Sequence, residues 1–331
     1  MSRATLSVVM PNYNHAHYLA EAITGIVNQS RPPDEFLLLD DCSTDHSLAV
    51  IEPFLQRFRG MRLLLHKRNQ GVVASVEQLV REARGDYVLC AAADDIRMPG
   101  FFAQALTLAE QHPAAGLVFG KVRMIDEAGR DLGMGEATRW QSPRFADPQC
   151  FLREYLLVER PSQAMTTSTV FRRDALLEAG IYPQELGSWA DAFVVRAIGL
   201  KYGVCYVPAE FTQTRTLAGS FSGHTAADPR RALNLIDRAE YLMKSPRYRD
   251  VFPADYVRQW RAAYRWQVIR DYFLGPEDPG QLRPSFLLRN VRRLPRVWRT
   301  FGLFFYRGDL SCFQTTAGSP ANEDTQVDVA R

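Results

Sequence analysis

Residues 6–14 read Leu-Ser-Val-Val-Met-Pro-Asn-Tyr-Asn, an apolar run that gives way to polar side chains within a few positions. The run from Leu6 to Met10 predicts a buried strand. We expect this strand to end at Pro11, because proline cannot donate a hydrogen bond to a sheet ladder. The polar residues Asn12 to Asn14 then follow the carboxyl end of the first predicted strand.

The same pattern recurs along the first part of the chain. Strands are predicted at 36–39, 61–65 and 87–92, and segments with one apolar stripe predict helices at 18–27, 48–58 and 72–84. The polar clusters that follow these strands are Asp40-Asp41, Lys67-Arg68-Asn69 and Asp94-Asp95. This alternation predicts an α/β fold with a mainly parallel sheet that helices cover on both faces. Because ligands of such sheets bind at the carboxyl ends of the strands, the polar clusters should share one edge.

The middle of the chain is less regular. It contains predicted strands at 117–122, 166–171 and 204–207, a predicted hairpin turn at 127–130 and a predicted helix at 190–200. We also expect Ser43-Thr44-Asp45 to cap the second helix of the chain. From about residue 228 onward the pattern is helical and rich in arginine and aromatic residues.

Composition excludes several classes of protein. The chain is 46% hydrophobic and 23% charged with a formal net charge of +3, which is typical of a globular protein and gives no indication of nucleic-acid binding. Its five cysteines are too widely spaced for the usual zinc sites or a CxxC redox pair, which favours a reducing compartment. No stretch approaches the ~18 apolar residues that span a bilayer, so we expect a cytoplasmic protein.

Two pairs of adjacent aspartates are candidates for chemistry. The negative charge of Asp94-Asp95 is unfavourable without a cation, which suits Mg²⁺ or Mn²⁺ shared with substrate phosphates. The alternative is a helix cap ahead of Pro99-Gly100. Asp40-Asp41 can accept hydrogen bonds from a nucleobase or a ribose, or can form a turn with Cys42-Ser43.

In combination, these segments are more specific than any of them alone. Residues 8–14, 38–45, 69–71 and 92–95 resemble, in order, the P-x-Y-N, V-D-D-x-S-x-D, N-x-G and x-D-D motifs of family 2 glycosyltransferases of the GT-A fold. The resemblance covers about Leu6 to Ser222, and it implies a GT-A catalytic domain at residues 1–224. It further implies a nucleotide-sugar site formed by Pro11, Tyr13, Asn14, Asp40, Asp41, Asn69, Asp94 and Arg215.

The resemblance also implies individual roles. Pro11 and Tyr13 would line the base pocket, and Asp41 would accept a hydrogen bond from the base. Asp95, helped by Asp94, would hold Mg²⁺ or Mn²⁺ on the diphosphate of the donor. Where many members have the first aspartate of D-x-D this chain has Ala92, so metal binding would depend on the other two carboxylates.

Family 2 enzymes invert configuration in one displacement, so a single base suffices, and Asp191 is the candidate. The family often has an acidic pair at this place, whose first member is Ala190 here. The alternative is that Asp191 only adds negative charge to a helix start. Arg215 lies in a segment that resembles the arginine-bearing end of the catalytic domain, where it could contact the diphosphate or be a surface arginine.

Residues 225–314 are predicted to form a basic helical extension and residues 315–331 a disordered tail. Between 281 and 306 there is no acidic residue, and arginines alternate with apolar groups at helical spacing. Such a helix can lie on an anionic membrane surface, which lipid-linked acceptors would favour, or it can pack on the catalytic domain.

The resemblance implies a metal-dependent, inverting hexosyltransferase that moves a sugar from a UDP-sugar to a saccharide or lipid-linked acceptor in bacterial surface polysaccharide synthesis. Ala92 and Ala190 motivate the alternative of a degenerate homologue that binds a nucleotide or a partner without turnover. A sugar-nucleotide pyrophosphorylase or a dinucleotide oxidoreductase would need a glycine-rich loop after the first strand, where this chain has Pro11 to Asn14.

Overall fold

The computed structural model describes residues 3–135, 140–158, 163–217 and 228–274. The chain divides into two compact units, Met1–Arg258 and Gln259–Arg331, and every candidate site residue belongs to the first. The limits that we predicted for the catalytic domain, 1–224, stay a prediction. The basic stretch 281–306 and the predicted tail 315–331 lie outside the described residues.

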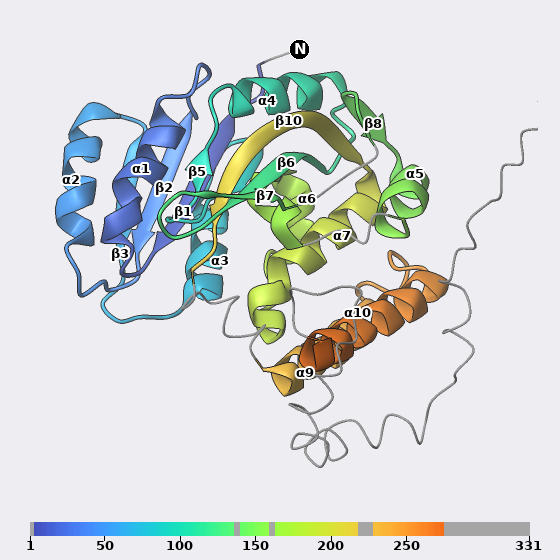
Figure 1. Cartoon of the computed structure of the whole chain (residues 1–331). Coiled ribbons are helices and arrows are strands. Elements are labelled where there is room, and N and C mark those ends of the chain that lie inside the picture. The colour runs from blue at the N-terminus through green and yellow to red at the C-terminus, as the bar shows by residue number, and fades with distance from the viewer. Residues whose placement is uncertain (1–2, 136–139, 159–162, 218–227, 275–331) are drawn as a thin grey trace, which may run out of the picture. The chain divides into compact units, whose positions relative to one another are not determined.

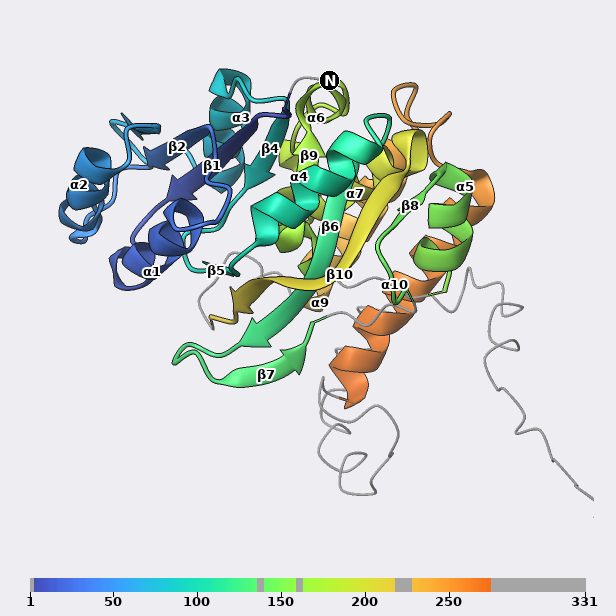
Figure 2. The ribbon, with the colours of Figure 1, turned by 90° about the horizontal axis from the view of Figure 1, so that it is seen from above.

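One mixed sheet forms the centre of the first unit, with the strand order β3-β2-β1-β4-β9-β6-β10-β5 (Figure 1 and Figure 2). The strands from the start of the chain form its parallel half, in which β1 pairs with β2 on one side and with β4 on the other. They are β1 (Leu6–Asn12), β2 (Glu35–Asp40), β3 (Met61–Leu65) and β4 (Tyr87–Cys90). The predicted parallel α/β architecture is thereby confirmed.

Helices cover both faces of this half of the sheet. They are α1 (Ala16–Val27), α2 (Ser47–Arg57), α3 (Val72–Glu82) and α4 (Phe101–Gln111). Alternate residues of a strand point to opposite faces, and Val8 and Met10 of β1 join a buried apolar cluster with Leu19 of α1 and Phe101 of α4. Helix α3 contacts β1 and β2 from the opposite side (Figure 2).

The second half of the sheet mixes strand directions, with β10 parallel to β6 and β9 antiparallel to both β4 and β6. Its strands are β5 (Ile96–Arg97), β6 (Leu117–Ile125), β7 (Asp131–Met134), β8 (Arg144–Ala146), β9 (Val170–Arg172) and β10 (Val204–Arg215). The predicted hairpin turn is confirmed between β6 and β7, where Gly129 has a φ of +82° that suits glycine.

Helical segments fill the remainder of the described chain. They are α5 (Pro148–Cys150), the π-helix η1 (Phe151–Leu156), the 3₁₀-helices η2 (Gln163–Ser168) and η3 (Gln184–Trp189), α6 (Arg173–Glu178), α7 (Ala190–Tyr202), α9 (Pro229–Met243) and α10 (Ala254–Leu274). Among the described residues, no helix has both the length and the apolar character that a membrane crossing requires.

The prediction that β1 ends at Pro11 is wrong, because the strand continues to Asn12. The Val9 carbonyl accepts a hydrogen bond from the Ala91 N–H, which directly follows β4. Backbone groups two residues apart in a strand point to the same side, so the nitrogen of Pro11 also faces β4. The pairing of β1 with β4 stops at Val9, whereas the pairing with β2 extends to Asn12. Proline is tolerated because its missing donor falls where no ladder bond is required.

The strand predicted at 166–171 is shorter than expected. Residues 163–168 form the 3₁₀-helix η2, and only β9 is extended. Hydroxyl groups explain this difference, because Ser168 Oγ and Thr169 Oγ1 both donate to the Met165 carbonyl at 3.0 and 2.8 Å. Such local hydrogen bonds compete with a strand ladder.

Strand β10 is longer than the predicted 204–207. It passes Pro208 through register irregularities between Tyr206 and Thr212, and it ends at Arg215. A bulge lets a strand contain proline and bend, which the sequence pattern alone does not indicate. The bend brings the end of β10 to β5, and so to the loop that carries the second aspartate pair.

The predicted cap of the second helix is confirmed only for Asp45, whose Oδ1 accepts from the Ser47 N–H at 3.0 Å and from Ser47 Oγ at 2.6 Å. Helix α2 begins at Ser47, and its N-cap residue is His46. Ser43 and Thr44 instead contact Asn14, and Asp45 bridges to the start of α1 by accepting from the Ala16 N–H at 2.9 Å. The polar residues after β2 therefore join two loops, and Asp45 holds the starts of both α1 and α2.

Candidate functional site

A buried carboxylate ties together the ends of β1 and β2. Asp40 accepts from Asn12 Nδ2 at 2.7 Å, from Ser43 Oγ at 2.6 Å and from the Ser43 N–H at 2.9 Å. Both oxygens of Asp40 are engaged, as the turn alternative requires. Asp40 thus anchors two loops, and a contact between it and a nucleotide stays a prediction.

Asn14 organises the same loops. It has a φ of +58°, in the left-handed region that asparagine tolerates, and its Oδ1 accepts from the Thr44 N–H at 2.8 Å. Beside it, Tyr13 is 42% exposed and Pro11 is partly exposed. An aromatic face is therefore accessible at this edge of the sheet for stacking on a planar ligand.

Asp41 lies nearly buried next to the loop between β3 and α3. Its Oδ1 accepts from the Gln70 N–H at 2.9 Å and lies 2.7 Å from His66 Nδ1, and its Oδ2 accepts from the Gly71 N–H at 2.8 Å. Burial raises the pKa of Asp41, but the hydrogen bonds from Gln70, His66 and Gly71 outweigh it and hold the pKa below its ordinary value. The carboxylate is ionised, and Oδ2 can accept a further donor.

Asn69 shapes the loop that leads to α3. Its Oδ1 accepts from the Gly71 N–H at 2.9 Å, and Gly71 has a φ of +89° directly ahead of the first residue of the helix. Asn69 is exposed at this point. It lies beside the N–H groups that hold Asp41, at the same edge of the sheet.

The aspartates after β4 differ in their surroundings. Asp95 is 2% exposed, and its oxygens accept from the Arg215 N–H at 3.0 Å and from Thr214 Oγ1 at 3.3 Å. Asp94 is partly exposed, and among the described residues no other residue donates a hydrogen bond to its carboxylate. Neither aspartate caps α4, whose N-cap is Gly100. Asp94 is thus the more available metal ligand, whereas we predicted Asp95 as the main ligand with Asp94 in support.

A buried arginine lies beneath this pair. Arg97 is 2% exposed, and its Nη1 lies 3.5 Å from Asp95 Oδ2. Burial raises the pKa of both aspartates, and the charge of Arg97 opposes that rise. Part of the cation that the carboxylate pair requires is therefore supplied by the protein itself.

Arg215 is neither a surface residue nor, in this structure, a group that reaches out for phosphate. Its side chain is 4% exposed. The guanidinium donates to the carbonyls of Asp94, Asp126 and Glu127 at 3.1, 3.3 and 3.0 Å, and to the Glu21 carboxylate at 2.8 Å. It also lies 4.7 Å from the centre of the Tyr18 ring. Arg215 thus clamps β10 to the aspartate loop, the β6–β7 turn and α1, so the surface alternative is wrong, and a diphosphate contact stays a prediction.

Asp191 lies in the first turn of α7. Its Oδ2 accepts from Thr166 Oγ1 at 2.7 Å, and its Oδ1 accepts from the Ala192 N–H at 2.6 Å. Burial raises the pKa of Asp191, against the hydrogen bonds from Thr166 and Ala192. A carboxylate with a raised pKa is a better proton acceptor than an ordinary one, as general base catalysis requires.

Two consecutive threonines of η2 join Asp191 to the aspartate loop. Thr166 donates to Asp191, and Thr167 Oγ1 lies 2.8 Å from Thr214 Oγ1. Thr214 in turn donates to Asp95. Residues from four distant segments of the chain therefore converge at the carboxyl edge of the sheet.

Three polar residues at this edge were missed by sequence reasoning. His66 follows β3 and contacts Asp41, Arg97 lies next to Asp95, and His15 is close enough to Asp45 and Asp95 to interact with their charges. Burial lowers the pKa of His15, although both aspartates oppose this. His15 directly follows the cluster Asn12 to Asn14, and His66 directly precedes the cluster Lys67-Arg68-Asn69; this position beside a strand-end cluster is the signal that could have found them.

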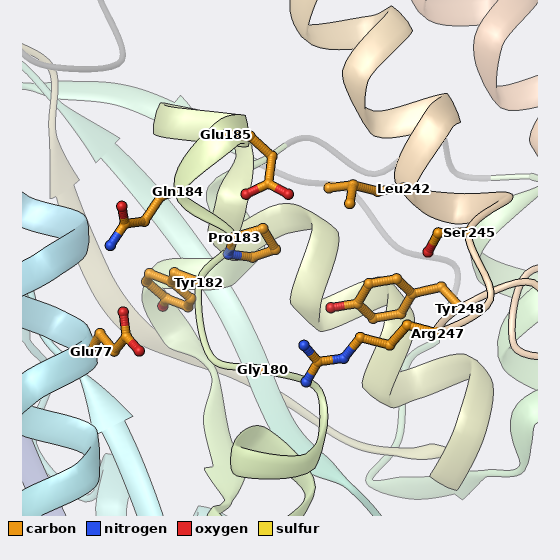
Figure 3. A pocket seen from close by; sticks show the side chains of 10 residues that line it. All are labelled: Glu77, Gly180, Tyr182, Pro183, Gln184, Glu185, Leu242, Ser245, Arg247 and Tyr248. Carbon is orange, nitrogen blue, oxygen red and sulfur yellow. The ribbon is translucent and has the colours of Figure 1, made fainter.

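A cavity of about 360 Å³ is lined in part by Tyr182, whose hydroxyl is close enough to Asp191 to interact with its charge (Figure 3). Its polar lining includes Gln184, Glu185 and Arg247, with the rings of Tyr182 and Tyr248. The Tyr182 hydroxyl hydrogen-bonds to Cys90, and burial raises its pKa well above the ordinary value, with Asp191 adding to the rise. Tyr182 therefore lines the cavity and also lies near the candidate base.

The described residues contain no group of three or more histidine, cysteine or acidic side chains arranged to hold a metal ion. Mg²⁺ does not need such a group when substrate phosphates supply ligands, because one or two carboxylates then suffice. The open carboxylate of Asp94 fits this requirement. Asp95 fits it less well, since protein donors already engage both its oxygens.

Solved structures share this arrangement of strands and helices. The chain superimposes on S. aureus TarS 1-349 in complex with UDP-GlcNAc with a TM-score of 0.64 at 15% identity, covering 91% of this chain and 80% of that one. It superimposes on the mannosyltransferase PcManGT from Pyrobaculum calidifontis, in complex with GDP-Man and Mn²⁺, with a TM-score of 0.56 at 17% identity, covering 92% and 86%. The fold is therefore the GT-A fold of glycosyltransferases.

Sequence comparison identifies the family. An uncharacterized glycosyltransferase of Methanocaldococcus jannaschii is 29% identical over 191 residues, which are 57% of this chain and 64% of that protein. The model of glycosyl transferase family 2 matches residues 7–178, more than half of the chain. The chain belongs to glycosyl transferase family 2, and the resemblance that its motifs indicated is confirmed.

Proposed function

We propose that this chain is an inverting hexosyltransferase that moves a sugar from a UDP-sugar to a saccharide or lipid-linked acceptor with the help of a divalent metal. The observation that carries the proposal is the threonine bridge that brings Asp191 to the edge where Asp94 and Asp95 lie. A base and a diphosphate site must adjoin for a single displacement. Family membership supports the use of a nucleotide-sugar donor.

The proposed nucleotide pocket lies at the ends of β1 and β2. Tyr13 and Pro11 would contact the base face, and Asp41 Oδ2 would accept from a ring N–H, which uracil and guanine can donate. UDP is preferred because TarS, the neighbour with the higher TM-score of the two, binds UDP-GlcNAc, whereas PcManGT binds GDP-Man. Asn14, Asp40 and Asn69 would hold the surrounding loops in place.

The diphosphate would lie over Asp94. Asp94, with Asp95 behind it, would hold Mg²⁺ or Mn²⁺, and the ion when bound would act as a Lewis acid on the departing phosphate oxygens. Arg97 limits the repulsion within the carboxylate pair. Arg215 fixes the position of Asp94 because its guanidinium donates a hydrogen bond to the Asp94 carbonyl.

Asp191 would act as the base. As the acceptor oxygen attacks the anomeric carbon, its proton passes to a carboxylate oxygen of Asp191 and the bond to the diphosphate breaks on the opposite face. Thr166 and the Ala192 N–H orient the carboxylate. The single displacement inverts the anomeric configuration and needs no second base.

The acceptor is proposed to approach through the cavity beside Tyr182. Its amide, carboxylate and hydroxyl groups suit the hydroxyl groups of a saccharide, and its two tyrosine rings suit a sugar face. Gln184→Ala should then raise the KM for the acceptor and leave the KM for the donor unchanged. Equal KM values for wild type and variant would place the acceptor elsewhere.

The proposed setting is bacterial surface polysaccharide synthesis at the inner face of the membrane. A decisive experiment measures binding and turnover of UDP-GlcNAc and GDP-Man by calorimetry and product detection, with Mn²⁺ and with EDTA. Mn²⁺-dependent transfer or hydrolysis of UDP-GlcNAc is expected. Binding without turnover on any acceptor would favour the degenerate homologue that Ala92 and Ala190 suggest.

A further inference from the structure

His66 is the only titratable side chain among the described residues that contacts the carboxylate of Asp41. Its Nδ1 lies 2.7 Å from Asp41 Oδ1, and its Nε2 lies 2.8 Å from Gln78 Oε1 on α3. Its side chain is 7% exposed. The backbone N–H of His66 also donates to the Asp40 carbonyl at 3.0 Å, so the residue is fixed at both ends.

Both ring nitrogens of His66 face oxygen atoms that can only accept. Asp41 is an ionised carboxylate, and the orientation of the Gln78 amide is set by its own Nε2, which donates to Glu82 Oε1 at 3.2 Å. Turning the amide over would bring its oxygen against the Glu82 carboxylate. A neutral imidazole has one N–H, so only the doubly protonated ring satisfies both neighbours.

We infer that His66 is a positioning residue of the donor site, which as an imidazolium holds Asp41 in place for the nucleobase, so that nucleotide affinity depends on the charge of His66. The inference rests on the proposed function, because it takes Asp41 as the acceptor for the base. His66 itself does not touch the donor. Its effect passes through the single hydrogen bond to Asp41 Oδ1.

The surrounding charges support a cationic ring. Asp41 faces it from the end of β2, and Gln78 from α3 connects it to Glu82, which pairs with Arg62 of β3 at 3.3 Å. Burial lowers the pKa of His66, but the hydrogen bonds to Gln78 and Asp41 and the charge of Asp41 outweigh it and raise the pKa above the ordinary 6.5. Lys67 and Arg68 adjoin it in sequence, but both are exposed to solvent.

The sign of the pH dependence follows from this raised pKa. The imidazolium holds Asp41 while the pH stays below the raised pKa of His66 in the folded protein, and this contribution to donor affinity is lost as the pH rises through that pKa. Above that point one ring nitrogen presents a lone pair to an acceptor. Asp41 or Gln78 must then move, and donor affinity should fall.

The test uses UDP-GlcNAc with Mg²⁺, because its diphosphate is esterified at both ends and has no phosphate group titrating near pH 6. Calorimetry from about pH 6 to pH 8 should show wild-type affinity falling about ten-fold, the loss of one hydrogen bond to a charged group. Gln78→Met removes the second acceptor, so a neutral His66 can still donate to Asp41. This variant should lose most of the pH dependence.

Gln78→Glu should act in the opposite direction. The added carboxylate stabilises the imidazolium, so the fall in affinity should move to higher pH by about one unit. His66→Leu should bind weakly at every pH, and His112→Asn is the matched control. His112 stacks on Phe145 just before β6 begins, at the opposite edge of the sheet, and its replacement should change nothing.

Nitrogen NMR of the imidazole reads the charge of His66 directly in the free protein. Two ring protons on His66 are expected to predominate at pH 6.5, and a mostly neutral ring at that pH would overturn the inference whatever the donor does. Donor binding with the same pH profile in wild type and both Gln78 variants would also overturn it. Absence of UDP-GlcNAc binding at every pH would instead refute the proposed donor, and the inference with it.

Discussion

Replacing Arg215 by methionine tests whether this arginine holds the site together or contacts the donor. Its guanidinium makes three hydrogen bonds to the backbone carbonyls of Asp94, Asp126 and Glu127, and an ion pair with Glu21. We expect the variant to fold with lower stability. We also expect weaker donor binding as a secondary effect, because the Asp94 loop loses its clamp.

The magnitude follows from these contacts. Each carbonyl hydrogen bond contributes roughly 1 kcal/mol net, and the contact with the Tyr18 ring adds about 0.5 kcal/mol. Because the Glu21 side chain is 56% exposed, its ion pair is screened and is counted as well under about 1 kcal/mol. The free energy of unfolding should therefore fall by about 3–4 kcal/mol, which lowers Tm by about 10 °C in a domain of this size.

Thermal and urea unfolding measure this change, with Arg130→Met as the control. Arg130 lies in the β6–β7 turn with an 82% exposed side chain and one ion pair, so its replacement should alter stability by less than about 0.5 kcal/mol. Arg215→Lys should not restore stability, since an ammonium group cannot reproduce the fork of a guanidinium. An unchanged Tm together with abolished UDP-GlcNAc binding would refute the clamp and indicate a direct diphosphate contact.

Three further predictions concern the donor site and the base. Asp94→Asn should weaken Mn²⁺ binding in the presence of UDP about ten-fold, as measured by calorimetry. Asp95→Asn should chiefly lower Tm in thermal unfolding, because it breaks a buried ion pair. The reverse pattern would make Asp95 the metal ligand. Tyr13→Ala should raise the Kd of UDP about ten-fold through lost stacking, and an unchanged Kd would place the base elsewhere. The kcat of the wild type should fall as the pH drops through the raised pKa of Asp191, because only the ionised carboxylate accepts a proton; a kcat that is constant at acidic pH would argue against this base.

The sequence predicted the parallel half of the sheet and the edge where the polar residues gather. Both depend on local patterns, such as the apolar run of β1 and the aspartates that follow β2 and β4. The roles of single side chains were harder to predict, because their partners lie far away in the chain. Arg215 binds Glu21 across 194 positions, and no motif marks that pair.

Which aspartate of each pair anchors a loop and which is available to a ligand could not be predicted either. Asp40 and Asp95 have the same sequence context as their neighbours, but in the structure they serve as buried anchors of loops, and Asp94 has the open carboxylate. Strand β10 was not predicted beyond residue 207, because Pro208 argues against a strand and the sequence pattern does not indicate the bulge that accommodates it. Such features depend on which donors the tertiary fold brings within reach, which periodicity does not report.

The most direct test of the central claim is the rate of sugar transfer by Asp191→Asn, with UDP-GlcNAc binding measured on the same preparation. The amide keeps the size of the carboxylate and can still accept from Thr166, but it cannot take a proton from the acceptor. We predict that kcat falls by about 10² to 10⁴ while the Kd of UDP-GlcNAc stays within about two-fold of the wild-type value. Transfer at the wild-type rate by this variant would contradict the assignment of Asp191 as the base. It would also contradict the proposal that Asp191 and the Asp94-Asp95 loop, which Thr166 and Thr167 connect, form one active site.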